Sequence, residues 1–291
     1  MKTALLSEHS RQFERLRFAY PVVSRRSRGL SLGLNVNPDK VCNFDCPYCQ
    51  VDRTVAPRDK QVDFDVMIAE IDALMGLAAS GEIWNHPKFA DTPPHLRRFN
   101  DIAFAGDGEP TTYPRLGEAI REVARLREKH KLPEVKIIVL TNGLLLNKLS
   151  VLSALEELKV GPYEVWAKLD AGTQDYFEFI AGRQLSLQRV VDNIALAGSR
   201  LEITVQSLFP TVDGKDPADA EIDAFAERIN EICAKGGKLR LVQVYTTARR
   251  PALGRIGMIE DARLDSIGAR IAMKVDVPVE VYYGRHWDSS D

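Results

Sequence analysis

Three cysteines, Cys42, Cys46 and Cys49, lie close together near the start of the chain. Their Cys-x3-Cys-x2-Cys spacing follows an apolar, strand-like stretch, and three thiolates spaced in this way can ligate three irons of a four-iron cluster. The remaining cysteine, Cys233, lies far along the sequence, so one iron would lack a protein ligand. An open coordination position is where a metal site does chemistry. A zinc site completed by a ligand from elsewhere is the alternative, although zinc motifs more often use paired Cys-x2-Cys.

The cysteine motif resembles the signature of the radical S-adenosylmethionine (SAM) superfamily, which carries an aromatic residue just before the last cysteine, here Tyr48. The resemblance implies that Cys42, Cys46 and Cys49 bind a 4Fe-4S cluster whose open iron is chelated by SAM. It also implies that one electron from the cluster cleaves the sulfonium bond of SAM to give a 5'-deoxyadenosyl radical. An external electron donor of the flavodoxin or ferredoxin type is then the expected partner.

A second motif follows another strand-like run and contains Gly106, Asp107, Gly108 and Glu109. It is similar to the superfamily's Gly-Gly-Glu motif, which holds the amino group of SAM. Glycines let a backbone approach a ligand closely, and an ammonium group requires carbonyl or carboxylate acceptors. Asp107 and Gly108 stand where the superfamily motif has two contiguous glycines. Either Asp107 or Glu109 is therefore expected to contact the amino group of SAM.

Further matches to SAM-binding positions lie at the ends of later strands. Asp170 is similar to the superfamily's residues that bond the ribose hydroxyls, and its alternative role is a helix or turn cap. Weaker matches for the ribose, carboxylate and adenine are Gln206, Ser207, Val244 and Tyr245, the last two through their backbone. Over residues 20–251 the chain resembles the branch of iron-sulfur oxidoreductases related to wyosine-tRNA synthesis proteins. Those enzymes carry additional cysteines that this chain lacks, so the resemblance does not imply that this chain catalyses their reaction.

The elements that must position these residues alternate between strands and helices. Apolar runs predict strands near 31–36, 101–106, 135–141, 164–169, 201–208, 239–245 and 277–283. Helical stripes lie near 64–78, 115–129, 148–159, 186–198, 218–235 and 261–273. This alternation predicts an α/β fold, a partial or full (β/α)6-7 barrel of parallel strands with its functional face at their carboxyl ends.

Alternation along the predicted strands separates an apolar face from a polar one. Helices must cover the apolar faces, so the polar faces point into the barrel. They carry Asn35, Lys168, Asp170, Thr204 and Gln206. Lysine and aspartate are rarely buried unless they are paired or used. The sequence therefore predicts a polar binding cavity.

Substrate contacts are expected on this polar face, although no catalytic residue is identified. The candidates are Lys168, Tyr245, Arg249 and Arg250. Paired arginines after the sixth predicted strand can clamp a phosphate or a carboxylate. A solvated loop is the alternative interpretation of the arginine pair.

One barrel domain is expected over residues 29–284, with residues 84–98 as an inserted loop or lid. The lid assignment rests on three prolines and the absence of periodicity. Residues 1–28 form a basic N-terminal extension before the first predicted strand, and residues 285–291 form a C-terminal tail.

The composition of the 291 residues narrows the possible partners. A net charge of -2 argues against a wholly basic nucleic-acid binder but allows local patches. No apolar run approaches the roughly 18 residues of a membrane span, and the first residues are no secretory signal, so a cytoplasmic protein without a membrane partner is expected. Cys233 continues an apolar helical stripe with Ile222, Phe225 and Ile229 and is expected in the core. Because further cysteines are missing, a single cluster is predicted.

Together these features predict a cytoplasmic radical SAM enzyme that abstracts hydrogen from an unidentified substrate. An RNA base and a metabolite bearing a phosphate or carboxylate both fit. One alternative is an activase of the glycyl-radical type that acts on a protein partner. Another is a non-catalytic, metal-binding scaffold or sensor.

Overall fold

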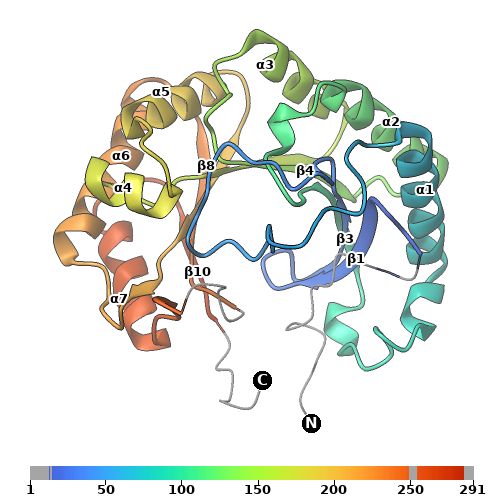
Figure 1. Ribbon diagram of the computed structural model, residues 1–291, viewed down its shortest axis with the longest axis horizontal. Coiled ribbons are helices and arrows are strands. Elements are labelled where there is room, and N and C mark those ends of the chain that lie inside the picture. The colour runs from blue at the N-terminus through green and yellow to red at the C-terminus, as the bar shows by residue number, and fades with distance from the viewer. Residues whose placement is uncertain (1–12, 14, 249–253, 285–291) are drawn as a thin grey trace. The chain divides into compact units, whose positions relative to one another are not determined.

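A computed structural model describes residue 13 and residues 15–248 and 254–284, and Figure 1 presents it. The chain divides into two compact units. Unit 1 consists of residues 1–42, 53–140 and 149–164, and unit 2 consists of residues 43–52, 141–148 and 165–291. Strands and helices alternate along both units, and the strand pairs are mostly parallel, so the predicted α/β class is confirmed.

Unit 1 is built around the first four strands. β1 (Ala19–Ser24) pairs antiparallel with β2 (Gly29–Leu34), and β3 (Phe99–Phe104) and β4 (Lys136–Thr141) continue in parallel. Its helices are α1 (Phe64–Ser80), α2 (Leu116–Lys129) and α3 (Leu149–Glu156), with 3-10 turns at Glu82–Asn85, Pro94–Leu96, Pro110–Thr112 and Glu157–Val160. Figure 1 shows α1 and α2 side by side along the outer side of these strands.

Local chemistry explains where α1 begins and ends. The Asp63 side chain accepts a hydrogen bond from the backbone N–H of Val66, which caps the first turn. Gly81 ends the helix in the left-handed conformation with φ 79°, which glycine adopts without a steric penalty. Between them the apolar stripe of the sequence is buried, including Met67 and Ile71.

Unit 2 carries the later strands, all parallel to their neighbours. They are β5 (Tyr163–Lys168), β6 (Ile203–Leu208), β8 (Leu239–Tyr245) and β10 (Val279–Tyr282), beside a small antiparallel pair of β7 (Thr211–Val212) and β9 (Ile256–Gly257). Its helices are α4 (Gln174–Ala181), α5 (Leu187–Gly198), α6 (Asp219–Ala234) and α7 (Asp261–Ala272). In Figure 1, α5, α6 and α7 follow one another along the outer side of the strands of unit 2.

The predicted strands and helices correspond to observed elements, but β1, α4 and the short strands β7 and β9 were not anticipated. β1 lies at 19–24, ahead of the first predicted strand, and contains Pro21. Proline disfavours a strand interior but is tolerated at a sheet edge, and β1 is the first strand in the sheet order. α4 has only eight residues, too few to give a clear helical period.

Residues 84–98, expected as a loop or lid, form short turns and pack against Phe13. Phe89 is buried, and its ring lies 6.1 Å from that of Phe13 and 6.0 Å from that of His86, measured between centroids. The segment is therefore an ordered connection within unit 1.

The expectation that Cys233 belongs to the core is wrong. α6 buries Ile222, Phe225, Ile229 and Ile232, whereas Cys233 is exposed. Cys233 lies in the last turn of α6, which ends at Ala234, so it is exposed even though its position continues the apolar stripe. None of the helices in the described parts of the chain is long and apolar enough to cross a membrane.

A carboxyl group is buried on β3. Asp101 is 2% exposed, and its Oδ1 accepts a hydrogen bond from the Ser31 hydroxyl at 2.5 Å. Its Oδ2 has no hydrogen-bond partner within the described residues. Burial raises the pKa of Asp101 from 3.8 to about 6. Because the folded state then holds the proton more tightly than the unfolded chain, this group stabilises the fold below pH 3.8, and that contribution is lost as the pH rises through about 6.

We expect Asp101→Asn to remove this pH dependence, because an amide does not ionise. The stability of the variant relative to the wild type should rise by on the order of 2–3 kcal/mol between pH 4 and pH 7. Urea unfolding of both proteins across this range measures the difference, and other titrating groups cancel in it. A constant difference would contradict the assignment.

Candidate functional site

The loop that carries Cys46 and Cys49 belongs to unit 2 and is attached to α4. The Cys49 N–H donates to the Cys46 carbonyl at 2.9 Å, which closes a turn. Just before it, the Asp45 N–H donates to the carbonyl of Ala181 at 2.8 Å. The preceding Phe44 is buried, with its ring edge-on to Phe177 at a centroid separation of 5.9 Å. Backbone bonds and an apolar anchor thus fix a segment that has no regular secondary structure.

Gly182 permits this attachment. It ends α4 with φ 66°, and a Cβ built there would lie 1.9 Å from the carbonyl oxygen of Asp45. Both the left-handed conformation and the close approach therefore require glycine.

The cysteines provide suitable donors for a metal cluster. Cys42, Cys46 and Cys49 are half-buried and none is in a disulfide. Burial raises the pKa of Cys46 to about 12, so its thiol is protonated at neutral pH when no metal is bound. The exposed Cys233 lies on α6, outside the motif. Within the described residues, no three histidine, cysteine or carboxylate side chains already converge on a common metal position.

Asp170 lies just after β5 and is bonded from three directions. Its Oδ2 accepts a hydrogen bond from the Tyr48 hydroxyl at 2.5 Å, and its Oδ1 accepts one from the Leu208 N–H at 2.8 Å. The ammonium of Lys168 lies 3.2 Å from Oδ2. The N-cap residue of α4 is Thr173, and Asp170 does not cap that helix. The carboxylate instead connects the cysteine loop, β5 and β6.

Lys168 completes this cluster. Its Nζ donates to the Tyr245 hydroxyl at 2.9 Å and lies 4.9 Å from the centre of the Tyr48 ring. Burial alone would lower the pKa of Lys168, but Asp170 and Tyr245 outweigh it and raise that pKa. Lys168 is therefore an ammonium at neutral pH. Four residues singled out from the sequence thus lie together within unit 2.

A polar row continues from Lys168 across the neighbouring strands. The register aligns Lys168 with Gln206 on β6, Gln243 on β8 and Glu280 on β10. Gln206 Nε2 donates to Gln243 Oε1 at 2.7 Å, and both amides are buried. Gln243 was missed in the sequence, although it precedes Tyr245 by two residues and therefore shares its face.

Ser207 and Val244 occupy the opposite face of the same strands. They are aligned with each other in the β6–β8 register, alternate with Gln206 and Gln243, and are fully buried. The Ser207 hydroxyl has no hydrogen-bond partner in the described part of the chain. Side chains alternate along a strand, so only the backbone of Ser207 and Val244 is available on the face of Lys168.

The glycine-rich motif lies in unit 1 and is held by Asn35. The Asn35 amide donates to Asp107 Oδ2 at 2.7 Å, and the Asp107 N–H donates to Asn35 Oδ1 at 3.0 Å. A Cβ at Gly106 would lie 2.1 Å from Asn35 Oδ1, and one at Gly108 would lie 2.2 Å from the carbonyl oxygen of Val41, the residue before Cys42. The motif therefore passes directly along the backbone that leads into the cysteines.

The two carboxylates of this motif have different environments. Glu109 is 3% exposed, and its Oε1 accepts hydrogen bonds from the Thr111 N–H at 3.2 Å and the Thr111 hydroxyl at 2.5 Å. It caps the turn Pro110–Thr112, whereas Asp107 is half-buried. The predicted arginine pair, Arg249 and Arg250, lies outside the described residues.

Solved structures share this fold. A radical SAM methyltransferase from Sphaerobacter thermophilus has a TM-score of 0.59 at 16% identity, covering 89% of this chain and 67% of that one. The structure of TYW1 with a lysine-pyruvate adduct bound has a TM-score of 0.53 at 15% identity, covering 93% and 80%. The chain thus has the fold of the radical SAM enzymes, a partial (β/α) barrel, and the resemblance drawn from the sequence is confirmed at the level of fold.

No family model matches the chain, but sequence relatives do. The chain is 26% identical to the GTPase Obg of Brachyspira hyodysenteriae over 89% of its own length and 34% of that protein. It is 30% identical to a UPF0026 protein of Helicobacter pylori over 48% of its length and 39% of that protein. A UPF0026 protein of Methanocaldococcus jannaschii is 32% identical over 43% and 33%. The chain therefore spans only a third to two fifths of these curated relatives.

Replacing Gly182 by alanine tests the attachment of the cysteine loop. The added Cβ collides with the Asp45 backbone, which we expect to cost about 1–3 kcal/mol beyond the strain of the left-handed conformation. Gly214→Ala is the matched control, since Gly214 has φ 73° and nothing lies within 4 Å of its Cβ position. Urea unfolding should show the larger loss for Gly182→Ala. Equal losses would mean that the loop is not held at Gly182.

The pairing of Lys168 with Asp170 can be measured by a double-mutant cycle. Lys168→Met and Asp170→Asn should each destabilise the protein by roughly 2–5 kcal/mol, because the first leaves the buried Asp170 carboxylate and the second the half-buried Lys168 ammonium without its partner. The double variant should lose less than the sum of the two, by more than about 0.5 kcal/mol. Additive losses in urea unfolding would show that the two groups do not depend on each other.

Proposed function

We propose that this chain is a cytoplasmic radical SAM enzyme that uses one 4Fe-4S cluster and SAM. The main support is the spacing of Cys42, Cys46 and Cys49 in a chain that has the radical SAM fold. These three thiolates would hold the cluster and leave one iron open. When bound, the cluster and SAM supply a reductive cleavage that yields a 5'-deoxyadenosyl radical able to abstract hydrogen from a substrate.

Other residues of the chain would bind and orient SAM. Asp107 or Glu109 would accept hydrogen bonds from its amino group, while Gly106 and Gly108 allow a close backbone approach. Asp170 would accept hydrogen bonds from the ribose hydroxyls, and its bonds to Leu208 and Tyr48 fix the direction of its lone pairs. Gln206 and the backbone of Ser207 and Val244 are the weaker candidates.

A substrate would meet a positive charge and a hydroxyl on the polar face. Lys168 stays protonated, and Tyr245 is bonded to it, so an anionic or strongly polar group of the substrate fits there. TYW1 has been seen with a lysine-pyruvate adduct. We do not assign such an adduct to Lys168, because adduct formation requires a neutral amine. Arg249 and Arg250 remain sequence-based candidates for a phosphate or carboxylate clamp, and nucleic acid is retained as a possible substrate class.

Anaerobic reconstitution tests the proposal. The wild type should bind about four irons per chain and, with dithionite and SAM, release 5'-deoxyadenosine. Cys46→Ala should lose both properties because it removes a cluster ligand. Cys233→Ala is the matched control, since that thiol is exposed on α6 and outside the motif, and it should retain both.

Each negative result of this experiment would favour a different function for the chain. Bound zinc, or iron without cleavage of SAM, would favour the scaffold or sensor over an enzyme. Cleavage that is stimulated only by a protein partner would favour the activase. Cleavage of SAM by Cys46→Ala would refute the assignment of the cluster ligands.

A further inference from the structure

Two polar side chains of α6 hold the turn that follows β5. Glu221 Oε1 accepts hydrogen bonds from the backbone N–H groups of Gly172 at 2.5 Å and Thr173 at 3.3 Å. Its Oε2 accepts one from the Thr173 hydroxyl at 2.6 Å. Arg228, two turns further along α6, donates from Nε to the Gly172 carbonyl at 3.1 Å. Both backbone polar groups of Gly172 are thus bonded to the same helix.

The turn also lies directly against the backbone of α6. A Cβ at Gly172 would lie 2.1 Å from the backbone nitrogen of Phe225 and 2.4 Å from the carbonyl carbon of Ala224. Neither atom can move without disturbing the helix, so only glycine fits. Glu221 is 9% exposed, which makes its hydrogen bonds hard for water to replace.

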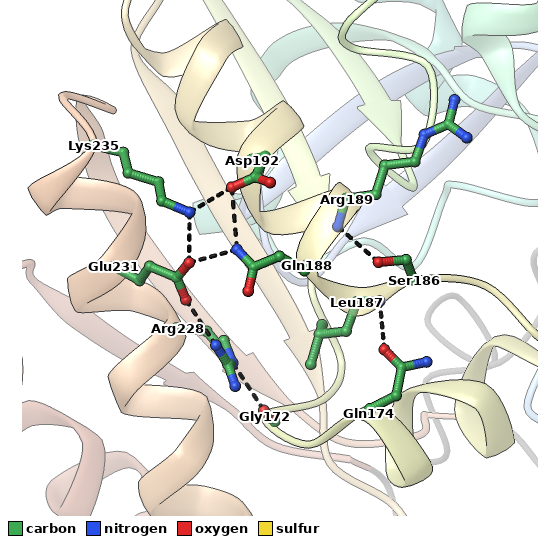
Figure 2. A network of polar contacts seen from close by, with 10 residues as sticks. All are labelled: Gly172, Gln174, Ser186, Leu187, Gln188, Arg189, Asp192, Arg228, Glu231 and Lys235. Carbon is green, nitrogen blue, oxygen red and sulfur yellow. Dashed lines mark hydrogen bonds and ion pairs between the residues drawn. The ribbon is translucent and has the colours of Figure 1, made fainter.

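Figure 2 shows that the same contacts continue outward and connect α6 to α5. Arg228 donates to Glu231 at 2.7 Å, and Glu231 accepts from Lys235 at 2.6 Å and from Gln188 at 2.5 Å. Lys235 and Gln188 both bond to Asp192 of α5, at 2.5 Å and 3.1 Å. Exposed ion pairs of this kind contribute little stability one by one. As a network they fix the orientation of the helix that carries Glu221.

Asp170 begins the turn that Glu221 holds. Only Ala171 separates it from Gly172, and Ala171 is itself buried. One end of this short segment is fixed by the bond between Asp170 and the Leu208 N–H, and the other by Glu221. A binding side chain must be held to within about 0.5 Å by the residues behind it. The position of the Asp170 carboxylate therefore depends on α6.

We propose that Glu221 is a positioning residue, which holds the Gly172–Thr173 turn so that Asp170 is aimed at its ligand. The inference rests on the proposed function, in which Asp170 binds the ribose of SAM. A purely structural role for Glu221 would lower stability and leave the affinity for SAM unchanged. A positioning role weakens SAM binding in folded protein that has its full iron content.

Glu221→Ala in anaerobically reconstituted, full-length protein tests the proposal. Equilibrium dialysis with SAM should give a Kd about tenfold higher than that of the wild type, as is usual when a supporting residue is removed. Iron content and the EPR spectrum without SAM should match the wild type, while the spectral change on adding SAM shifts to higher SAM concentration. Glu227→Ala, an exposed carboxylate on the same helix, is the matched control and should leave the Kd within twofold.

If Glu221→Ala does not fold, a second pair of variants tests the positioning role of Glu221. Thr173→Val removes the hydroxyl that bonds Glu221, and Thr173→Ser keeps it. Weaker SAM binding by the valine variant, with wild-type binding by the serine variant, supports the positioning role. Equal binding by both overturns it.

The outcomes separate this inference from the function on which it rests. A wild type that does not bind SAM overturns the proposed function, and the role of Glu221 with it. A wild type that binds SAM, with a Glu221→Ala variant that binds it equally well, overturns only the positioning role. Reduced stability of that variant with an unchanged Kd likewise overturns the positioning role alone.

Discussion

The pairing of the half-buried ammonium of Lys168 with the buried carboxylate of Asp170 is the constraint on which the rest of unit 2 depends. Charges withdrawn from water require partners, and these two supply each other at 3.2 Å. The ion pair alone does not satisfy every hydrogen-bonding position of the carboxylate and the ammonium. Tyr48, Leu208 and Tyr245 do so, and they come from the cysteine loop, β6 and β8. One ion pair therefore connects three separate segments.

This arrangement explains how an irregular loop becomes a defined part of the site. A segment without secondary structure must satisfy its polar groups through specific contacts. The loop does so through Tyr48 on one side and the Asp45 N–H on the other, and Phe44 adds buried apolar surface. Fixed points on both sides of Cys46 restrict where its sulfur can lie. No three candidate ligand side chains converge on a common position within the described residues, so metal binding would still have to bring the cysteine sulfurs together.

Much of the fold could be predicted from the sequence because the signals are local. Strands show an alternation of period 2 and helices a stripe of period 3.6, so β8 was placed to the residue. Prediction failed where another force overrode the pattern. Pro21 is tolerated because β1 lies at a sheet edge, and Cys233 is exposed in the last turn of α6 although it continues the apolar stripe. Strand alternation likewise predicted that Lys168 and Gln206 lie on the polar faces of their strands, and the β5–β6 register aligns them with each other.

The parts of the site that sequence could not provide are contacts between residues far apart in the chain. Glu221 looks like an ordinary acidic residue in the first turn of a helix, where the helix dipole favours it. Its actual partner, Gly172, lies 49 residues away. A glycine in the sequence can indicate that the backbone packs closely against another segment, but it does not identify that segment. Gly182 packs against the backbone of Asp45, whereas Gly172 packs against the backbone of α6. Such pairings arise from the packing of whole elements, so they are read only once the elements have been placed.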